Sequence, residues 1–369
     1  MEKSNGLIDT RIIKYTPLIS PYQVMQDIPR SEQAKETVIR GRRDIENILN
    51  KNNNDRIFIT TGPCSIHDTE ATFYYAERAK ELDAKVSDRF LIIIRTYFEK
   101  PRTSLGWEGL IIDSNMDGSD DVNKGYHLSR KILLRISELG LPCATEYLES
   151  FTPQYNSDLI SWAAIGARTA YSPQHRKMAS GLSMPVGIKN DTHGDVSIAV
   201  NAILAAQIGR PFLGINEYGT SSIAKTSGNT DTHLVLRGGD TGPNYDKASV
   251  ERAQEMLKSK NLLPNIVVDC SHDNTMDGEG KKDYKKQIDV FQDTIKQVKD
   301  GNRGIVGLML ESNLKAGNQK IPSDLRGFDR STLEYGLSVT DPCLDLETTI
   351  DLIMDAYRTL SKTSAQVTK

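Results

Sequence analysis

Short apolar runs rich in β-branched residues alternate with longer helical patterns along this chain, and this alternation limits its fold more than any other feature. RIFITT and FLIIIR are two such runs, and their length and composition are typical of buried strands. Strands that alternate with helices pair in parallel, and eight of them can close into a barrel. We therefore predict an α/β protein, a (β/α)8 TIM barrel that occupies residues 51–369 as one catalytic domain.

The pattern contains eight predicted strands, with helices between them. The predicted strands are Arg56–Thr61, Phe90–Arg95, Pro142–Tyr147, Ile165–Thr169, Pro185–Lys189, Thr232–Arg237, Asn265–Asp269 and Gly304–Glu311. The predicted helices include Thr69–Val86, Val122–Leu139, Val196–Ile208, Ala248–Lys258 and Lys285–Val298. A doubly wound open sheet is the alternative architecture, but no GxGxxG motif follows the first strand.

Two segments fall outside the repeating pattern. Residues 1–50 form an N-terminal extension, an extended arm followed by a helix, for which Ser31 is a plausible N-cap. Residues 212–226 predict a β-hairpin inserted before the sixth barrel strand, with Phe212–Glu217 and Ser222–Thr226 as its strands and Tyr218-Gly219 as its turn.

Composition excludes several classes of function. The 369 residues carry 46 Lys and Arg against 49 Asp and Glu, a net charge of −3, which argues against a general nucleic-acid or membrane-surface binder. No apolar run approaches the roughly 20 residues of a membrane-spanning helix, and the N-terminus lacks the pattern of a signal peptide. The four cysteines lie far apart, so we expect a reducing, cytoplasmic location.

Chemically capable side chains stand at the carboxyl end of every predicted strand. In chain order they are Cys64, Arg95, Glu146, Arg168, Lys189, Arg237, His272 and Glu311. Barrel enzymes build their active sites from the loops at this end of the strands. A single charged residue there usually reflects solvation, but eight in eight strands favours a site.

The cations of this end form one chemical set: Arg95, Lys100, Arg102, Arg168, Lys189 and Arg237. Arginine offers a planar fork that suits phosphate or carboxylate, and lysine offers a movable point charge. Six cations on one face of a net-acidic protein indicate two or three anionic groups on the substrates.

The second set contains Cys64, His272 and Glu311, to which Asp341 is added from the loop after the last strand. A thiolate, an imidazole and two carboxylates suit one divalent transition metal, Mn, Fe, Co or Zn, better than Mg or Ca. Their spacing alone gives no support, and Cys64 could equally be a small buried hydrophobe.

Several motifs then follow one another in a familiar order. They include TGPCSIHD (61–68), RTYFEKPRTSLGWEGL (95–110), IGARTAYSPQHRKMASGLSMPVGIKN (165–190), LRGG (236–239), DCSH (269–272), LESNLKAGNQ (310–319) and SVTD (338–341). On these motifs the chain resembles the type I 3-deoxy-D-arabino-heptulosonate 7-phosphate (DAHP) synthases, of the feedback-regulated kind of enteric bacteria and yeast. The resemblance runs from about Asp9 to about Tyr357.

The resemblance implies a cytoplasmic transferase that condenses phosphoenolpyruvate with erythrose 4-phosphate, the first step of the shikimate pathway towards chorismate and the aromatic amino acids. It implies four metal ligands: Cys64, His272, Glu311 and Asp341. It implies phosphoenolpyruvate contacts from Arg95, Gly166, Ala167, Arg168, Lys189 and Arg237, and erythrose 4-phosphate contacts from Lys100, Arg102 and Thr103, with Asp341 also near the substrates. Lys100, His272 and Glu146 are the candidates for proton transfer.

The resemblance also implies a homodimer or homotetramer with an aromatic amino acid effector. The effector site would combine Asp9 of a neighbouring subunit's arm with Pro153, Gln154, Ser183, Phe212 and Tyr218. Packing at a subunit interface is the alternative role for Phe212 and Tyr218.

Some positions depart from the family pattern. Ala170-Tyr171 follows the GART motif (166–169) where Thr-Glu is usual, and the loops 274–282 and 321–335 are longer than typical. A related synthase that uses another aldose phosphate is therefore one alternative. A non-catalytic regulatory paralogue is the other, although a dead enzyme has no physical need to keep six mutually repelling cations together.

Overall fold

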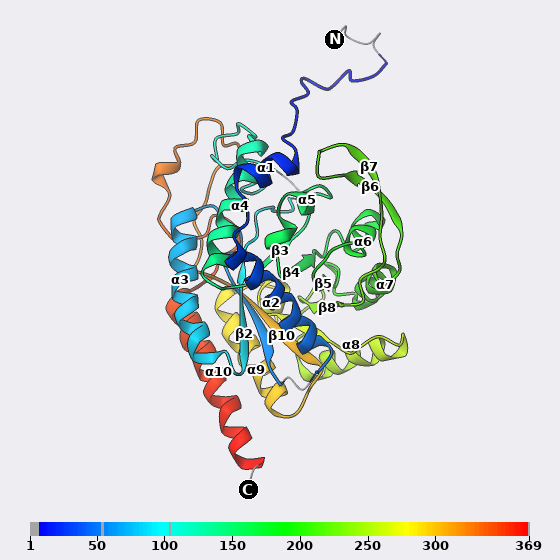
Figure 1. The fold of residues 1–369 in the computed structure, drawn as a ribbon. Helices are drawn as coiled ribbons and strands as arrows, with labels where there is room; N and C mark the ends of the chain where they lie inside the picture. Colours follow the sequence, from blue (N-terminus) through cyan, green and yellow to red (C-terminus); the bar gives the residue numbers. More distant parts are fainter. Residues whose placement is uncertain (1–6, 53–54, 103–104, 368–369) are drawn as a thin grey trace.

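A closed barrel of eight parallel strands forms the centre of the molecule (Figure 1). The computed structural model describes residues 7–52, 55–102 and 105–367. The barrel strands are β1 (Ile57–Gly62), β2 (Phe90–Arg95), β3 (Cys143–Glu146), β4 (Trp162–Ile165), β5 (Val186–Lys189), β8 (Thr232–Leu236), β9 (Ile266–Asp269) and β10 (Ile305–Asn313). Each strand pairs with the next in parallel, and β10 pairs with β1, so no barrel edge is left open. The predicted (β/α)8 barrel is confirmed.

Helices surround the barrel, and those that stand between two strands return the chain from one strand to the next (Figure 1). The longer ones are α2 (Glu32–Leu49), α3 (Thr69–Val86), α4 (Val122–Glu138), α7 (Val196–Ala206), α8 (Lys247–Ser259), α9 (Gln287–Lys299) and α10 (Leu346–Val367). Aspartates begin four of them: the carboxylates of Asp68, Asp121, Asp195 and Asp246 each accept a backbone N–H of the first turn. These caps satisfy N–H groups that have no partner within the helix, which is why the predicted starts of α3, α4 and α7 agree with the structure.

Shorter elements fill the connections. They are α1 (Pro21–Asp27), α5 (Thr152–Asn156), α6 (Pro173–Ala179), the 3-10 turns Ser157–Leu159, His272–Thr275, Tyr284–Lys286 and Arg330–Thr332, and the two-residue strand β11 (Leu344–Asp345) beside β10. The arm predicted as extended thus contains α1, which Ser20 caps and Pro21 begins.

The barrel interior is filled by side chains from alternate strand positions. Phe58, Trp162 and Val235 belong to this cluster, together with Ile45 and Ile48 of α2. Helix α2 therefore supplies part of the interior packing. Gly187 of β5 faces the Trp162 indole so closely that an added Cβ would lie 2.4 Å from Cζ2, so a larger residue there would displace the tryptophan.

The predicted fourth strand is wrong in position. Strand β4 covers Trp162–Ile165 rather than Ile165–Thr169, because the chain turns at Gly166: the amides of Thr169 and Ala170 both donate to the Gly166 carbonyl, at 3.1 and 2.9 Å. An added Cβ on Gly166 would lie 2.4 Å from Glu146 Oε1. Arg168 consequently lies in the loop after the strand.

The predicted hairpin forms as β6 (Pro211–Ile215) and β7 (Ser221–Lys225), antiparallel and outside the barrel sheet (Figure 1). The arm contacts its tip: the Tyr22 amide donates to the Glu217 carbonyl at 2.7 Å, and the Tyr22 and Tyr218 rings lie 5.4 Å apart. Within the described ranges, no helix has the length and apolar character needed to cross a bilayer.

Candidate active site

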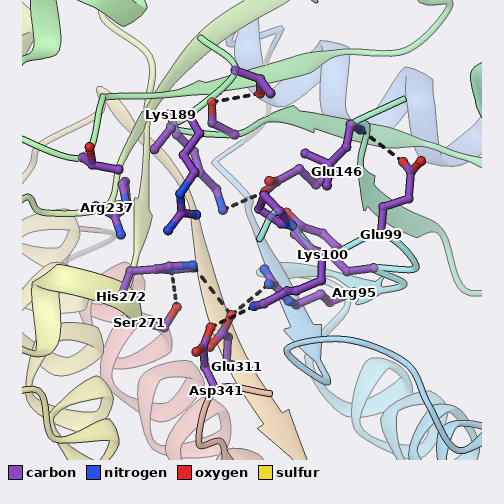
Figure 2. Close-up of a pocket in the computed structure, with 18 of the residues that line it drawn as sticks. Arg95, Glu99, Lys100, Glu146, Lys189, Arg237, Ser271, His272, Glu311 and Asp341 are labelled. Atoms are coloured by element: carbon purple, nitrogen blue, oxygen red, sulfur yellow. Dashed lines mark hydrogen bonds and ion pairs between the residues drawn. The ribbon is translucent and has the colours of Figure 1, made fainter. Parts of the chain in front are cut away.

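The carboxyl ends of the barrel strands surround a cavity of about 240 Å3, which we call the barrel-end pocket (Figure 2). Its lining includes most of the predicted site residues: Arg95, Lys100, Arg102, Glu146, Gly166, Ala167, Arg168, Lys189, Arg237, His272, Glu311 and Asp341. Cys64 is fully buried and reaches the same place through its thiol. Thr103 lies outside the described residues.

Three of the four predicted metal ligands form one cluster. Cys64, Glu311 and Asp341 each offer a ligand atom, and these atoms all lie within 4.8 Å of one another. His272 stands beside the cluster, with Nε2 3.9 Å from Glu311 Oε1. The residues come from four separate segments, so the barrel brings together what the sequence spacing does not.

The Lys100 ammonium occupies the middle of this cluster. Its Nζ donates to Cys64 Sγ and to Asp341 Oδ2, both at 2.8 Å. Lys100 holds the pKa of the Asp341 carboxyl well below its usual range. Burial opposes the charge of Lys100, but Cys64, Asp341 and Glu311 raise its pKa above the ordinary value. These ligands therefore create a point of strong negative potential that attracts a cation.

His272 is oriented by its own turn. Its Nδ1 lies 2.7 Å from Ser271 Oγ and 2.9 Å from Asp269 Oδ2, which leaves Nε2 facing Glu311. The backbone φ of His272 is 56°, a left-handed conformation that non-glycine residues rarely adopt. Such strain persists where the surrounding structure holds it, and it is common at functional sites.

Asp269 is a site residue that the sequence reasoning missed. It is fully buried, it holds His272, and its Oδ2 lies 3.6 Å from Lys189 Nζ. Burial alone would raise the pKa of this carboxyl, but His272 and Lys189 hold it well below its usual range. Asp269 is the last residue of β9, so the strand-end criterion that selected the other residues could have found it.

Lys189 and Glu146 form a buried ion pair across the pocket. Lys189 Nζ donates to Glu146 Oε2 at 3.0 Å, and the two side chains are 3% and 7% exposed. Burial would raise the pKa of Glu146, but Lys189 lowers it below its ordinary value, so Glu146 is a carboxylate near neutral pH. The pair keeps both charges in a region that water barely reaches.

Arg95 is fixed on three sides. Its Nη2 donates to Glu311 Oε1 at 2.8 Å, its Nε donates to the Pro63 carbonyl at 3.0 Å, and its guanidinium lies 3.5 Å from the centre of the Tyr97 ring. Tyr97, which the sequence reasoning also missed, is buried, and burial raises the pKa of its phenol to about 12. A guanidinium stacked and hydrogen-bonded in this way is preorganised for an anion.

Of the remaining predicted cations, Arg102 and Arg168 are exposed and Arg237 is buried. Arg168 is exposed and lies in the loop after β4, and Arg102 Nε donates to the Trp107 carbonyl at 2.9 Å. The Arg237 amide donates to Asn190 Oδ1 at 2.9 Å, and its guanidinium pairs with Asp273. Figure 2 shows Arg237 on the side of the pocket away from Arg95 and Lys100.

A second cavity of about 240 Å3, the hairpin pocket, lies between α5, α6 and the β6–β7 hairpin. Three of the predicted effector residues, Pro153, Gln154 and Phe212, line it. The other predicted effector residues are not part of its lining: Asp9, Ser183 and Tyr218 are exposed. Tyr218 contacts Tyr22 of the arm instead.

The closed parallel barrel and the cation-rich pocket at its carboxyl end define a (β/α)8-barrel enzyme for small polyanionic substrates. Within this class the family is shown by sequence: residues 34–353 match the family described as "DAHP synthetase I family". The chain belongs to the DAHP synthetase I family, which confirms the predicted family and enzyme class.

Curated relatives match almost the whole chain. It is 44% identical to the Tyr-sensitive phospho-2-dehydro-3-deoxyheptonate aldolase of Escherichia coli, over 97% of this chain and 98% of the relative. It is 44% identical to the Phe-sensitive protein of the same organism, over 94% and 95%, and 41% identical to the tyrosine-inhibited protein of Schizosaccharomyces pombe, over 95% and 92%. The phospho-2-dehydro-3-deoxyheptonate aldolase structure from Francisella tularensis has a TM-score of 0.89 and 43% identity, over 95% of this chain and 98% of that chain.

Proposed function

We propose that this enzyme condenses phosphoenolpyruvate, erythrose 4-phosphate and water to DAHP and inorganic phosphate in the barrel-end pocket. The observation that carries the proposal is the meeting of six predicted cations with the Cys64, Glu311 and Asp341 cluster around one cavity. The two substrates together carry two phosphates and one carboxylate, which matches this excess of cations. C3 of phosphoenolpyruvate attacks the aldehyde carbon, water adds at C2, and the resulting hemiketal phosphate expels phosphate.

Phosphoenolpyruvate would lie between the buried and the exposed cations. Arg95, Lys189 and Arg237 would hold its carboxylate and phosphate, with the main chain of Gly166 and Ala167 and the exposed Arg168 closing around the phosphate. Arg95 and Lys189 are 1% and 3% exposed and already paired, so they lose little freedom when the substrate binds. Because these cations are already in place, we expect that orientation of phosphoenolpyruvate supplies a large part of the rate enhancement.

The erythrose 4-phosphate side would be formed by the loop after β2. Lys100 and Arg102 line the pocket on this side, and Thr103 is assigned by the resemblance alone. Arg102 is exposed, so its guanidinium can meet the phosphate at the pocket mouth.

The cluster fits one divalent transition metal. A thiol sulfur with two carboxylates is a donor set for Mn, Fe, Co or Zn, and an ammonium already sits among these atoms, which supports a cation at this place. Cys64, Glu311, Asp341 and His272 would hold the metal, which would act as a Lewis acid on the aldehyde oxygen. Burial raises the pKa of the Cys64 thiol to about 12, so ligation would release its proton.

Three residues are proposed for the proton transfers. Glu146 is a carboxylate near neutral pH and can accept a proton. Lys100 is an ammonium that its acidic neighbours keep protonated, so it can donate one to the developing alkoxide. His272, oriented by Asp269 and Ser271, is the third candidate.

The hairpin pocket is proposed to bind an aromatic amino acid. The relatives named Tyr-sensitive, Phe-sensitive and tyrosine-inhibited support an effector of this class. Phe212, Pro153 and Gln154 would contact it, while Ser183, Tyr218 and Asp9 would complete the site in a homodimer or homotetramer. The cytoplasmic location and the single catalytic domain over 51–369 stay predictions.

Phosphate release tests the proposal directly. Metal-loaded protein should release phosphate from phosphoenolpyruvate when erythrose 4-phosphate is present, and lose this activity reversibly with EDTA. A panel of other aldose phosphates, arabinose 5-phosphate among them, serves as the control for substrate choice. Release with another aldose but not with erythrose 4-phosphate would contradict the proposed substrate, and no release with any aldose would favour a regulatory paralogue.

A further inference from the structure

The loop between β9 and α9 is a fixed turn that brings an extra lysine to the barrel-end pocket. Met276 and Lys282 form an antiparallel bridge, and the Asp277 amide donates to the Lys281 carbonyl at 2.9 Å. Asp277 Oδ1 accepts the amides of Glu279 and Lys281, at 3.0 and 2.8 Å. The bridge and these bonds set the place from which the Lys282 side chain leaves the turn.

Lys282 lines the pocket beside the predicted phosphate contacts. Its Nζ pairs with Asp273 Oδ1, and Asp273 Oδ2 pairs with Arg237 Nη1. The Asp273 and Arg237 side chains are 9% and 8% exposed, whereas Lys282 is 55% exposed at the mouth. One buried carboxylate therefore joins a deep cation to a peripheral one.

The negative charge of Asp273 opposes phosphate binding at Arg237, and the positive charge of Lys282 offsets it. A carboxylate in contact with Arg237 competes with a substrate phosphate for the same guanidinium, because both anions prefer its fork. Lys282 attracts the same carboxylate and offsets its charge, so that the three side chains keep a net charge of +1.

We propose that Asp273 and Lys282 form a charge-compensated pair that sets the affinity of Arg237 for the phosphate of phosphoenolpyruvate. Asp273 orients the Arg237 guanidinium. Lys282 offsets the negative charge of Asp273, so that this charge does not weaken the binding of the phosphate to Arg237. Lys282 is thus a positioning residue for the substrate, and this role rests on the proposed function, which assigns Arg237 to that phosphate.

The test compares K282A, D273N and the double variant D273N/K282A, with K281A as the control for loss of a lysine from the same turn. Phosphoenolpyruvate binding is measured by calorimetry, and KM and kcat are measured with erythrose 4-phosphate. K282A should raise both the Kd and the KM for phosphoenolpyruvate about tenfold, as loss of one close charge does, with kcat within about twofold. K281A should match the wild type.

The double variant provides the decisive comparison. It should recover most of the affinity lost in K282A, because the uncompensated carboxylate is gone, and a merely structural role for Lys282 would not give this recovery. Equal affinities for K282A and K281A, or a double variant as weak as K282A, would overturn the inference. Wild-type protein that binds phosphoenolpyruvate but does not turn over with erythrose 4-phosphate would contradict the proposed function, while the calorimetric comparison would still decide this inference.

Discussion

The barrel-end pocket and the hairpin pocket enclose similar volumes, about 240 Å3 each, but different kinds of side chain line them. The first is lined by paired charges, and its Arg95, Lys189 and Glu311 are at most 3% exposed. Among the described residues that line the second, Lys225 is the charged one, and it stands on a hairpin whose Leu213 and Ile223 are 71% and 74% exposed.

The difference separates two ways of binding a small molecule. Buried ion pairs such as Lys189–Glu146 hold their groups in one arrangement before the substrate arrives, which suits chemistry that depends on orientation. The hairpin pocket lies partly on a two-stranded hairpin with exposed side chains, and a hairpin of two strands is only marginally stable by itself, so this pocket has fewer fixed charges to orient a ligand. Substitutions in the barrel-end pocket should therefore change activity and stability, whereas substitutions in the hairpin pocket should change inhibition.

The largest effect is expected in the cluster of the barrel-end pocket. Cys64→Ala should lower kcat/KM on the order of 10^4-fold, since it removes a proposed ligand of the Lewis acid. Bound metal, measured by elemental analysis, should fall with it. Cys143→Ala, the same change at another buried cysteine, should keep both activity and metal. Wild-type turnover by Cys64→Ala would contradict the proposed metal site.

A second large effect is expected for Arg95→Ala, on stability as well as activity. The change removes the buried Arg95–Glu311 ion pair while leaving the Glu311 carboxylate in place, which costs about 3–5 kcal/mol in the free energy of unfolding. Urea denaturation measures this loss, and Arg252→Ala, at an exposed position of α8, provides the control. If the two variants were equally stable, the pocket would not be preorganised by buried pairs as described.

Glu99 connects the barrel-end pocket to the segment that forms part of the hairpin pocket. It lines the barrel-end pocket, while its carboxylate accepts the Leu148 amide and the hydroxyl of Thr152, the residue before Pro153 of the hairpin pocket. Burial raises the pKa of Glu99 from 4.5 to about 7. Between these values the folded protein holds a proton that the unfolded chain has released, so stability falls as pH rises from about 5 to 7.

Glu99→Gln cannot ionise and should lose this pH-dependent part of the stability. The unfolding free energy of the variant minus that of the wild type should therefore increase by up to about 3 kcal/mol as the pH rises from 5 to 8. Denaturation curves at the two pH values measure the change, with Glu36→Gln on the exposed face of α2 as the control. A pH dependence identical to that of the wild type would show that Glu99 is not held protonated by burial.

The smallest effect is expected in the hairpin pocket. Phe212→Ala should weaken inhibition by tyrosine or phenylalanine about tenfold, because it removes an aromatic contact, and should leave the uninhibited rate unchanged. Leu213→Ala, the exposed neighbour on the same strand, provides the matched control in inhibition curves. Loss of uninhibited activity in Phe212→Ala would contradict the separation of the two pockets.

The sequence by itself determined the barrel, and it predicted most of the residues that line the barrel-end pocket. Strand composition and the aspartate caps are local signals, so the boundaries of α3 and the end of β2 follow from neighbouring residues. The strand-end criterion found Cys64, Lys189 and Glu311 because a parallel barrel must place the ends of its strands together. The fourth strand was misplaced because Trp162–Ile165, with its two alanines, gives a weak β signal, and because the close approach of Gly166 to Glu146, which excludes a side chain there, is a tertiary contact.

Only the tertiary structure decided which charges pair. Nothing local in the sequence says that Lys100 lies between Cys64 and Asp341, that Asp269 serves both His272 and Lys189, or that Asp273 joins Arg237 to Lys282. Most of these partners come from different strands and loops; the exceptions are Asp269 with His272, three residues apart, and Asp273 with Lys282, which share the β9–α9 loop. Their distances are set by closure of the barrel, and the strength of each interaction is set by burial, which is a property of the folded chain as a whole.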